Sequence, residues 1–436
     1  MLPCLISFLL VAADPATTPL PDQTAKAEAL LAALAKADFK VAAKDFDDTM
    51  RRALPGDKLE QTWLAITKQL GPFGKRTATR AEKGAKYDTV FLTCKFEKAT
   101  LDLKVMFNKD KQVMGFFLVP VQGANAFKPP AYAKASEYRE TAVVVGDDWK
   151  LPGTLTMPRG EGPFPAVVLV HGSGPHDRDE TIGPNKPFRD LAWGLASKGV
   201  AVLRYEKRTH AHGGRYAALK GATMQDEVVD DALAAVALAR GHKGVDPSRV
   251  FVAGHSLGGY LAPRIAATDA KVAGIVILAG NTRPLEDLVL EQFTYIYSLN
   301  DPTLEKDKEA LAEIKKKVAR VKAEKLALAS TDELPLGVPA SYWQWMRAYD
   351  AAATAGKLRC PVLVLQGERD YQVTMADLAG WKKGLADHKD AKFVSYPKLN
   401  HLFMEGKGKS KPDEYGKAGH VAKEVVDEIA GWVKKR

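Results

Sequence analysis

The spacing of apolar residues changes from helical to alternating within the first part of the chain. Apolar side chains recur every three to four positions in 27–34 and again in 59–70, which predicts amphipathic helices. Apolar and polar residues mostly alternate in 90–107, and 113–119 is a further apolar run, which predicts strands with one buried face. Helices followed by such strands predict a small α+β domain over 24–119.

A stretch rich in Pro, Ala, Gly and Lys separates this region from the rest. It runs over 120–137 and includes Lys128-Pro129-Pro130, so it predicts a linker that is extended where the prolines stack. Because the linker is short, we expect the first domain to dock on the second domain or on another subunit. Phe91 and Met106, expected on the open face of its sheet, are candidate contacts, and a homodimer is one form of such docking.

Residues 138–436 have a different rhythm, in which short and almost wholly apolar segments alternate with helical stretches. Strands that are apolar on both faces predict a mostly parallel sheet covered by helices on both sides, which is an α/β fold. A mostly helical insertion interrupts the rhythm between 281 and 359 and predicts a lid. The predicted strands are Ala166–Val170, Val200–Leu203, Val250–Ala253, Gly274–Ala279, Pro361–Leu365 and Phe393–Tyr396.

Length and charge exclude several classes of protein. The chain has 436 residues, and one hydrophobic core rarely exceeds about 250–300 residues, so two domains are expected. The net charge is +10, but basic and acidic residues are interleaved, which favours a solvated surface over a nucleic-acid-binding one. No apolar run reaches the roughly 18–20 residues that a membrane-spanning helix needs, so stable membrane insertion is not expected.

The first residues of the chain are apolar. The segment Cys4–Ala13 ends in Val-Ala-Ala before Asp14, as the core and cleavage site of an export signal do. No Lys or Arg precedes it, so a plain apolar N-terminal segment is the alternative. We expect a signal peptide over 1–13 and a periplasmic or extracellular protein; without that signal the protein would be cytoplasmic.

The candidate chemistry begins at a serine between glycines, where a predicted strand turns into a predicted helix. So tight a turn strains the serine backbone and requires small neighbours, because strand and helix nearly touch there. The hydroxyl of Ser256 would then project at the edge of the sheet, where a base can reach it. A serine that caps a helix in a glycine-rich turn is the alternative. The motif reads Gly254-His255-Ser256-Leu257-Gly258.

A serine nucleophile requires a neutral imidazole to remove its proton and a carboxylate to orient that imidazole. Asp370 lies just past the predicted strand 361–365, and His401 lies just past 393–396. The resulting chain order of Ser, Asp and His is the one that this architecture uses.

Other acids and histidines fit these two roles less well. Glu368 and Asp377 are the alternative acids, but neither lies at the tip of the strand. His255 is expected to pack beneath the turn, His388 precedes the last strand, and His420 is expected within the final helix.

The tetrahedral intermediate also requires backbone donors for its negatively charged oxygen. The amide of Leu257 follows the nucleophile directly. The second donor should come from the loop 171–175, which follows a predicted strand, and the Ser173 amide is preferred there over that of Gly174. A simple glycine-rich turn is the alternative interpretation of that loop.

These motifs resemble those of the α/β-hydrolase superfamily over residues 138–436. More narrowly, they are similar to bacterial two-domain carboxylesterases of the serine-aminopeptidase-like and dienelactone-hydrolase-like branch. The resemblance implies that 25–119 form a cystatin-like or nuclear-transport-factor-like domain of unknown function. The motifs are G-H-S-L-G-G at 254–259, H-G-S-G-P-H-D-R-D-E at 171–180, R-Y-E-K-R at 204–208, G-E-R-D at 367–370 and N-H at 400–401.

Two departures from this branch bear on function. A dienelactone hydrolase would carry a cysteine where this chain has Ser256, which argues against that activity. The segment Arg208–His212 replaces the usual Arg-Gly turn, so the loop there is expected to differ. His176, His210 and His212 are weak metal-ligand candidates, since no carboxylate or cysteine accompanies them, and no metal or cofactor is expected.

The sequence therefore predicts a serine hydrolase that cleaves small carboxylic esters through an acyl-enzyme. A peptidase or amidase with the same triad is the alternative, and a non-catalytic binding protein on this scaffold is a further one. Aromatic residues of the lid are expected either to pack among helices or to line the substrate pocket. The candidates for the pocket are Phe293, Tyr297, Trp343 and Trp345.

Overall fold

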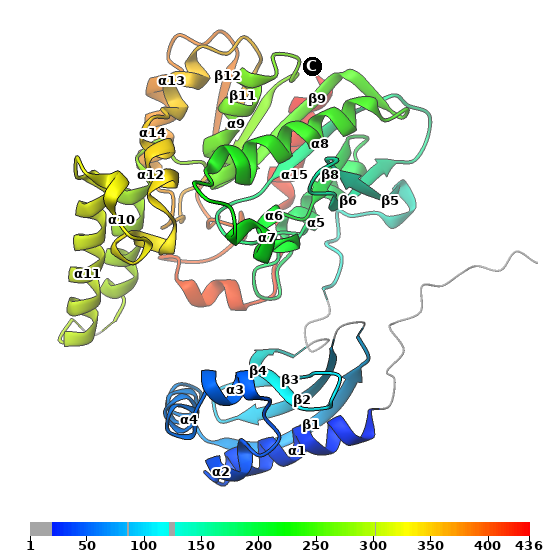
Figure 1. The fold of residues 1–436 in the computed structure, drawn as a ribbon. Coiled ribbons are helices and arrows are strands. Elements are labelled where there is room, and N and C mark those ends of the chain that lie inside the picture. Colours follow the sequence, from blue (N-terminus) through cyan, green and yellow to red (C-terminus); the bar gives the residue numbers. More distant parts are fainter. Residues whose placement is uncertain (1–19, 85–86, 122–126, 301) are drawn as a thin grey trace, which may run out of the picture. The chain divides into compact units, whose positions relative to one another are not determined.

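The chain forms two compact units that divide between residues 126 and 127 (Figure 1). The computed structural model describes residues 20–84, 87–121, 127–300 and 302–436. The segment 1–13, predicted to be an export signal, lies outside these residues. Each unit is described below by itself.

The first unit is an antiparallel sheet with helices on one face, in the strand order β1-β2-β3-β4. Alternate residues of the strands join the helices in one core, as the period of two predicts. Strand β1 was not predicted, because it is a largely exposed edge strand and carries no apolar alternation. The elements are α1 (Pro21–Ala35), α2 (Phe39–Ala42), α3 (Asp48–Ala53), α4 (Gly56–Leu70), β1 (Phe73–Glu82), β2 (Asp88–Phe96), β3 (Thr100–Phe107) and β4 (Val113–Pro120).

The other face of this sheet is more covered than the sequence suggested. The expectation that Phe91 is exposed is wrong: it is only 8% exposed, because the Arg80 guanidinium stacks 3.7 Å from its ring centre. Met106 is half-buried. The exposed aromatic residue on this face is Phe117, at 55%, which pairs across the strands with Lys104.

The second unit is built on an eight-stranded sheet in the order β12-β11-β10-β9-β7-β8-β6-β5. Its strands from β7 onward are parallel, and the hairpin β5–β6 adds two antiparallel strands at one edge. The predicted α/β-hydrolase fold is confirmed. The strands are β5 (Tyr138–Val145), β6 (Leu151–Pro158), β7 (Phe164–Val170), β8 (Ala201–Tyr205), β9 (Val245–His255), β10 (Ile275–Leu278), β11 (Val362–Gly367) and β12 (Ala391–Tyr396).

Helices cover both faces of this sheet (Figure 1). Val168 and Val170 of β7 pack in the core beneath α8 and α9, whereas Val167 and Leu169 pack in the core beneath α5 and α15. Strands buried on both sides must be apolar throughout, which explains the unbroken apolar runs. The helices are α5 (Pro187–Ala196), α6 (Arg208–Ala211), α7 (Gly213–Ala217), α8 (Asp230–Gly241), α9 (Leu257–Thr268), α14 (Met375–Gly384) and α15 (Lys423–Lys434).

The second half of the predicted linker belongs to this unit. The Tyr132 hydroxyl donates to the Val421 carbonyl at 2.7 Å, and the Phe127 ring packs edge-on against Trp193. The second unit therefore begins before β5.

The predicted lid lies between β10 and β11, where α10 and α11 lie apart from the helices that cover the sheet (Figure 1), while Tyr342 and Met346 of α12 join the core beneath α8 and α9. Part of it has a small apolar core of its own, which includes Val321, Leu326, Leu334 and Trp343. None of the helices in the described part of the chain has the length and apolar composition to cross a bilayer. The lid helices are α10 (Leu285–Ser298), α11 (Glu305–Lys322), α12 (Ala340–Arg347) and α13 (Ala351–Gly356).

Candidate active site

The nucleophile candidate lies at the junction of β9 and α9. Ser256 has φ 53° and ψ −116°, a strained conformation for a residue with a side chain. The flanking glycines are required by contact: a Cβ on Gly254 would lie 2.0 Å from the Gly258 carbonyl oxygen, and one on Gly258 would lie 2.1 Å from that of Val170. The sequence motif thus follows from how closely the strand and the helix approach each other.

The acid and base candidates follow β11 and β12, the two strands at one edge of the sheet. His401 Nδ1 lies 2.6 Å from Asp370 Oδ2, and the carboxylate is fully buried. Asp370 Oδ1 accepts main-chain hydrogen bonds from Gln372 at 2.7 Å and Val373 at 3.0 Å. A carboxylate held in this way makes Nδ1 the donor, which leaves Nε2 of a neutral imidazole to accept a proton. Ser256 and His401 line the same cavity.

The alternative acids and bases are engaged elsewhere. Glu368 is exposed and accepts from Ser395 at 2.8 Å, while Asp377 pairs with an arginine at the base of the lid. The expectation that His420 lies within the final helix is wrong: it precedes α15, and its ring is held 3.1 Å from Asp190. His388 lies beyond the end of α14.

Two main-chain amides are available at the cavity wall to hold a negatively charged oxygen. Leu257 is the first residue of α9, where a helix leaves its N–H groups without intrahelical acceptors. The Ser173 amide, in the loop after β7, donates to no acceptor in the described part of the chain. Both residues line the cavity, and Gly174, the less preferred candidate, does not.

A second histidine–carboxylate pair lies beneath the nucleophile. His255 Nδ1 is 3.0 Å from Glu180 Oε2, and both side chains are buried. His255 Nε2 donates to the His401 carbonyl at 2.9 Å, and Glu180 Oε1 accepts from the Gly172 amide at 2.7 Å. The pair therefore links the loop of the base to the loop of the Ser173 amide.

The charges of this second pair depend on one another. Burial by itself raises the pKa of Glu180, but the facing His255 outweighs it and the pKa falls to about 2. Burial likewise lowers the pKa of His255, but Glu180 outweighs it and raises the pKa above 6.5. The sequence predicted that His255 packs beneath the turn. It did not predict its partner Glu180, which is the last residue of the motif 171–180.

The cavity has a volume of about 400 Å³ and a mostly apolar wall. Of the predicted pocket residues, Phe293 lines it. The residues that the sequence analysis missed come from α10 and from the loop after Asp370. They are Leu285, Leu288, Val289, Gln292, Tyr371, Gln372 and Val373, joined by Ile182, Asn281, Leu336, Leu402 and Tyr415. The α10 residues among them recur every three to four positions, which places them on one face of the helix. This spacing is the sequence signal that could have identified them.

Three of the predicted pocket residues lie elsewhere, and their assignment to the pocket is wrong. Trp343 is fully buried in the core of the lid. Trp345 packs against Tyr349, with ring centres 5.6 Å apart. Tyr297 lies one helical turn beyond Phe293, with ring centres 6.0 Å apart, and is not part of the cavity wall. Aromatic content alone did not indicate which faces of the lid helices point to the cavity.

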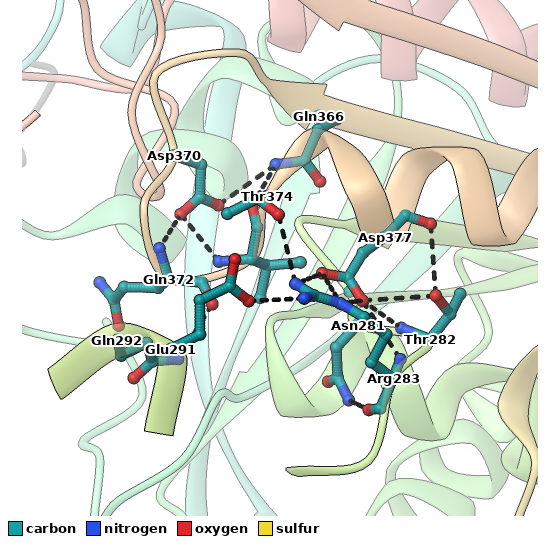
Figure 2. Close-up of polar contacts among 12 residues, drawn as sticks. Asn281, Thr282, Arg283, Glu291, Gln292, Gln366, Asp370, Gln372, Thr374 and Asp377 are labelled. Carbon is teal, nitrogen blue, oxygen red and sulfur yellow. Dashed lines mark hydrogen bonds and ion pairs between the residues drawn. The ribbon is translucent and has the colours of Figure 1, made fainter. Parts of the chain in front are cut away.

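The base of the lid is tied to the loop that carries the acid (Figure 2). Arg283 pairs with the fully buried Asp377 at 2.7 Å and with Glu291 of α10 at 2.5 Å. Gln292, also on α10, donates to the Gln372 carbonyl at 3.0 Å. The lid helix that lines the cavity is thereby held against the segment that follows Asp370.

The weak metal-ligand candidates are engaged with protein groups. His176 Nε2 lies 2.6 Å from the Ser173 carbonyl, and His210 lies 3.4 Å from Glu206. His212 packs against Trp149. In the described part of the chain no three potential ligands cluster around a common point.

Comparison with known proteins gives two family matches along the chain. The family described as "Serine aminopeptidase, S33" matches residues 162–407. A family of unknown function, DUF3887, matches residues 27–116, within the first unit.

Individual relatives include a curated esterase and several solved structures. The chain is 39% identical over 402 residues to Esterase EstD from Thermotoga maritima, covering 92% of this chain and 93% of the relative. Est1E from Butyrivibrio proteoclasticus is 19% identical with a TM-score of 0.44, covering 68% of this chain and 99% of that one. A puromycin-hydrolyzing peptidase from Mycobacterium tuberculosis is 15% identical with a TM-score of 0.44, covering 84% and 48%.

Proposed function

The chain belongs to the serine aminopeptidase S33 family of α/β-hydrolases, and from that premise we propose that it is a serine carboxylesterase. The observation that carries the proposal is the 2.6 Å contact of His401 with Asp370 at the wall of a cavity that also holds Ser256. The identity to an esterase over nearly the whole chain supports the same reaction.

The proposed reaction proceeds through an acyl-enzyme. Ser256 Oγ attacks the ester carbonyl carbon while His401 Nε2 takes the hydroxyl proton, and Asp370 stabilises the imidazolium that forms. The amides of Leu257 and Ser173 hold the negatively charged oxygen of the tetrahedral intermediate. Its collapse releases the alcohol, which carries away the proton from His401. A water molecule then attacks the acyl-enzyme by the same steps, which releases the acid and restores Ser256.

The cavity favours an ester over an aminopeptidase substrate. An aminopeptidase must hold the α-ammonium group of its substrate, and a carboxylate is the natural partner for it. Among the described residues that line the cavity, Glu180 is the one carboxylate. Its oxygens already face the Gly172 amide and the His255 ring. The remaining wall is mostly neutral and apolar, which suits an uncharged acyl group.

Parallel substrate series test this proposal. p-Nitrophenyl esters of graded acyl length and aminoacyl-anilides are assayed with the wild type and with Ser256→Ala. We expect turnover of esters, and a loss of about 10⁴–10⁶-fold in kcat in the variant, which should stay folded. A fluorophosphonate probe should label Ser256. Preferential turnover of the anilides, or labelling at another residue, would contradict the proposal.

Two finer proposals concern location and assembly. The composition of residues 4–13 supports export, and N-terminal sequencing of the mature protein should then begin near Asp14. We propose that the first unit docks on protein, including a second copy of the chain, rather than on nucleic acid. The exposed Phe117 supports protein docking. Light scattering over a range of concentrations and a titration with DNA distinguish these outcomes.

A further inference from the structure

A buried lysine that lies outside the cavity wall contacts the loop of the Ser173 amide. Lys207 follows β8, in the motif 204–208 to which the proposed reaction assigns no role. Its side chain is only 2% exposed, and its Nζ donates to the Gly172 carbonyl at 2.9 Å. Lys207 does not line the cavity, so it cannot touch a substrate there.

The carbonyl that Lys207 contacts belongs to the same peptide unit as the Ser173 N–H. The Gly172 carbonyl and the Ser173 N–H belong to one planar peptide unit, in which the two groups point in opposite directions when the unit is trans. A donor that holds the carbonyl on the buried side therefore turns the N–H toward the cavity, which Ser173 lines. The preceding peptide is held as well, because the Gly172 N–H donates to Glu180 at 2.7 Å.

A counter-charge holds Lys207 in place. Glu227 Oε1 pairs with Lys207 Nζ at 2.6 Å, and Glu227 Oε2 accepts from the hydroxyl of Tyr342, on lid helix α12, at 2.9 Å. Burying two charges carries a large desolvation cost, which their attraction offsets only if the pair is well placed and hydrogen-bonded. An apolar pair would fill this space without that cost, so stability alone does not explain an ammonium group on this carbonyl.

We propose that Lys207 is a positioning residue for the oxyanion donor at Ser173, a role that rests on the proposed esterase reaction. Its ammonium orients the Gly172–Ser173 peptide and, by withdrawing charge from the carbonyl oxygen, makes the Ser173 N–H a stronger donor. The benefit is greatest when negative charge develops on the substrate oxygen, so Lys207 acts on the transition state more than on substrate binding. Glu227, which accepts a hydrogen bond from the Tyr342 hydroxyl, holds the ammonium group against the Gly172 carbonyl.

The test removes the pair and measures the stabilisation of the transition state. In Lys207→Met/Glu227→Gln, kcat on the best ester should fall about 10–10²-fold while KM changes less than about threefold, as for a weakened oxyanion donor. The affinity for a trifluoromethyl ketone, which adds to Ser256 and forms a negatively charged oxygen, should fall by the same factor. The rate of fluorophosphonate labelling should fall in parallel, and this can be read even if no ester is turned over by the wild type.

A neighbouring buried ion pair supplies the matched control. Arg208 and Asp231 lie 2.5 Å apart and are equally buried, but neither contacts Gly172. Arg208→Met/Asp231→Asn should lose comparable thermal stability yet keep kcat within about threefold. A merely structural role for Lys207 would instead make the two double variants alike in kcat.

Further results would also overturn the role of Lys207. One is a folded Lys207→Met/Glu227→Gln enzyme with kcat within threefold of the wild type, and another is a loss of kcat with unchanged ketone affinity. If that variant does not fold, the crystal structure of the wild-type ketone adduct decides. The role of Lys207 requires the adduct oxygen to lie within hydrogen-bond distance of the Ser173 amide while Lys207 Nζ still contacts the Gly172 carbonyl. An adduct that lacks either contact would overturn it. Absence of ester turnover by the wild type would contradict the esterase proposal alone.

Discussion

The Asp370–His401 and Glu180–His255 pairs lie side by side, with imidazole ring centres 4.7 Å apart. Both histidines are nearly fully buried, and each has one ring nitrogen against a carboxylate. They differ at the second nitrogen. In His255 it faces the His401 carbonyl, so both nitrogens of that ring lie against acceptors, and Glu180 raises the pKa of the ring. In His401 the second nitrogen contacts no acceptor within the described residues, and the ring lines the cavity.

This difference indicates why, of two buried histidines with carboxylate partners, only His401 fits the role of the proposed base. A ring enclosed by two acceptors is favoured as a cation that ties two loops together, whereas a ring with one acceptor keeps a lone pair for the proton of the Ser256 hydroxyl. The identity of the group at the second nitrogen decides between a structural and a reactive histidine. Each pair can be altered separately, and the two should respond in different ways.

The largest effect is expected from the reactive pair. Asp370→Asn should lower kcat by about 10⁴-fold, because the amide no longer holds His401 in the tautomer that leaves Nε2 able to accept a proton. The folded structure should persist, as circular dichroism and thermal melting can show. Glu368→Gln, which removes the exposed alternative acid, is the control and should keep nearly full activity. If Asp370→Asn keeps more than a few per cent of the wild-type kcat, the Asp370–His401 pair is not the reactive pair.

A smaller effect on activity, but a larger one on stability, is expected from the enclosed pair. Glu180→Gln should lower kcat by about tenfold or less, and should lower the free energy of unfolding by about 3 kcal/mol, because it leaves the buried His255 cation without its counter-charge. Urea unfolding measures the stability difference. Unchanged stability would mean that the pair is not ionised as described.

The pH dependence of that stability difference has a defined sign. The pKa of Glu180 is about 2 in the folded chain, below its ordinary 4.5, so its stabilisation is complete above 4.5 and is lost as pH falls towards 2. The pKa of His255 is raised above 6.5, so its stabilisation is complete below 6.5 and is lost as pH rises through the folded value. The advantage of the wild type over Glu180→Gln should therefore be greatest between pH 4.5 and 6.5.

In free energy, the smallest effect is expected at the wall of the cavity that His401 also lines. Phe293→Ala should change the ratio of kcat/KM between short and long acyl esters by about tenfold. The substitution removes an apolar ring from the cavity wall and so enlarges the space for the acyl group by several methylene equivalents. Tyr297→Ala, one turn farther along α10 and outside the wall, should leave that ratio unchanged. Neither substitution should alter the pH dependence of stability that belongs to the enclosed pair. Equal shifts in both variants would show that the lid acts as a whole rather than through its cavity face.

Much of the fold and part of the site could be predicted because they depend on local geometry. Strands apolar on both faces indicated the parallel sheet, and the glycines around Ser256 follow from the contact of β9 with α9. Asp370 and His401 were selected because each follows a strand whose position in the sheet the chain order implies. The edge strand β1 carries no such pattern, since water replaces the packing that would impose one.

The rest was decided only by tertiary structure. The motifs 171–180 and 204–208 are visible in the sequence, but nothing in their spacing shows that Glu180 and Lys207 hold successive peptides on either side of Gly172. Nor does the aromatic content of the lid separate Phe293, which lines the cavity, from Trp343, which is buried in the core of the lid. A sequence specifies which face of an element is apolar through its period, whereas the partner of a buried charge is set by elements far apart in the chain. For that reason the sequence indicates the reacting groups, and only the packing of distant loops determines which histidine reacts and which one holds the site together.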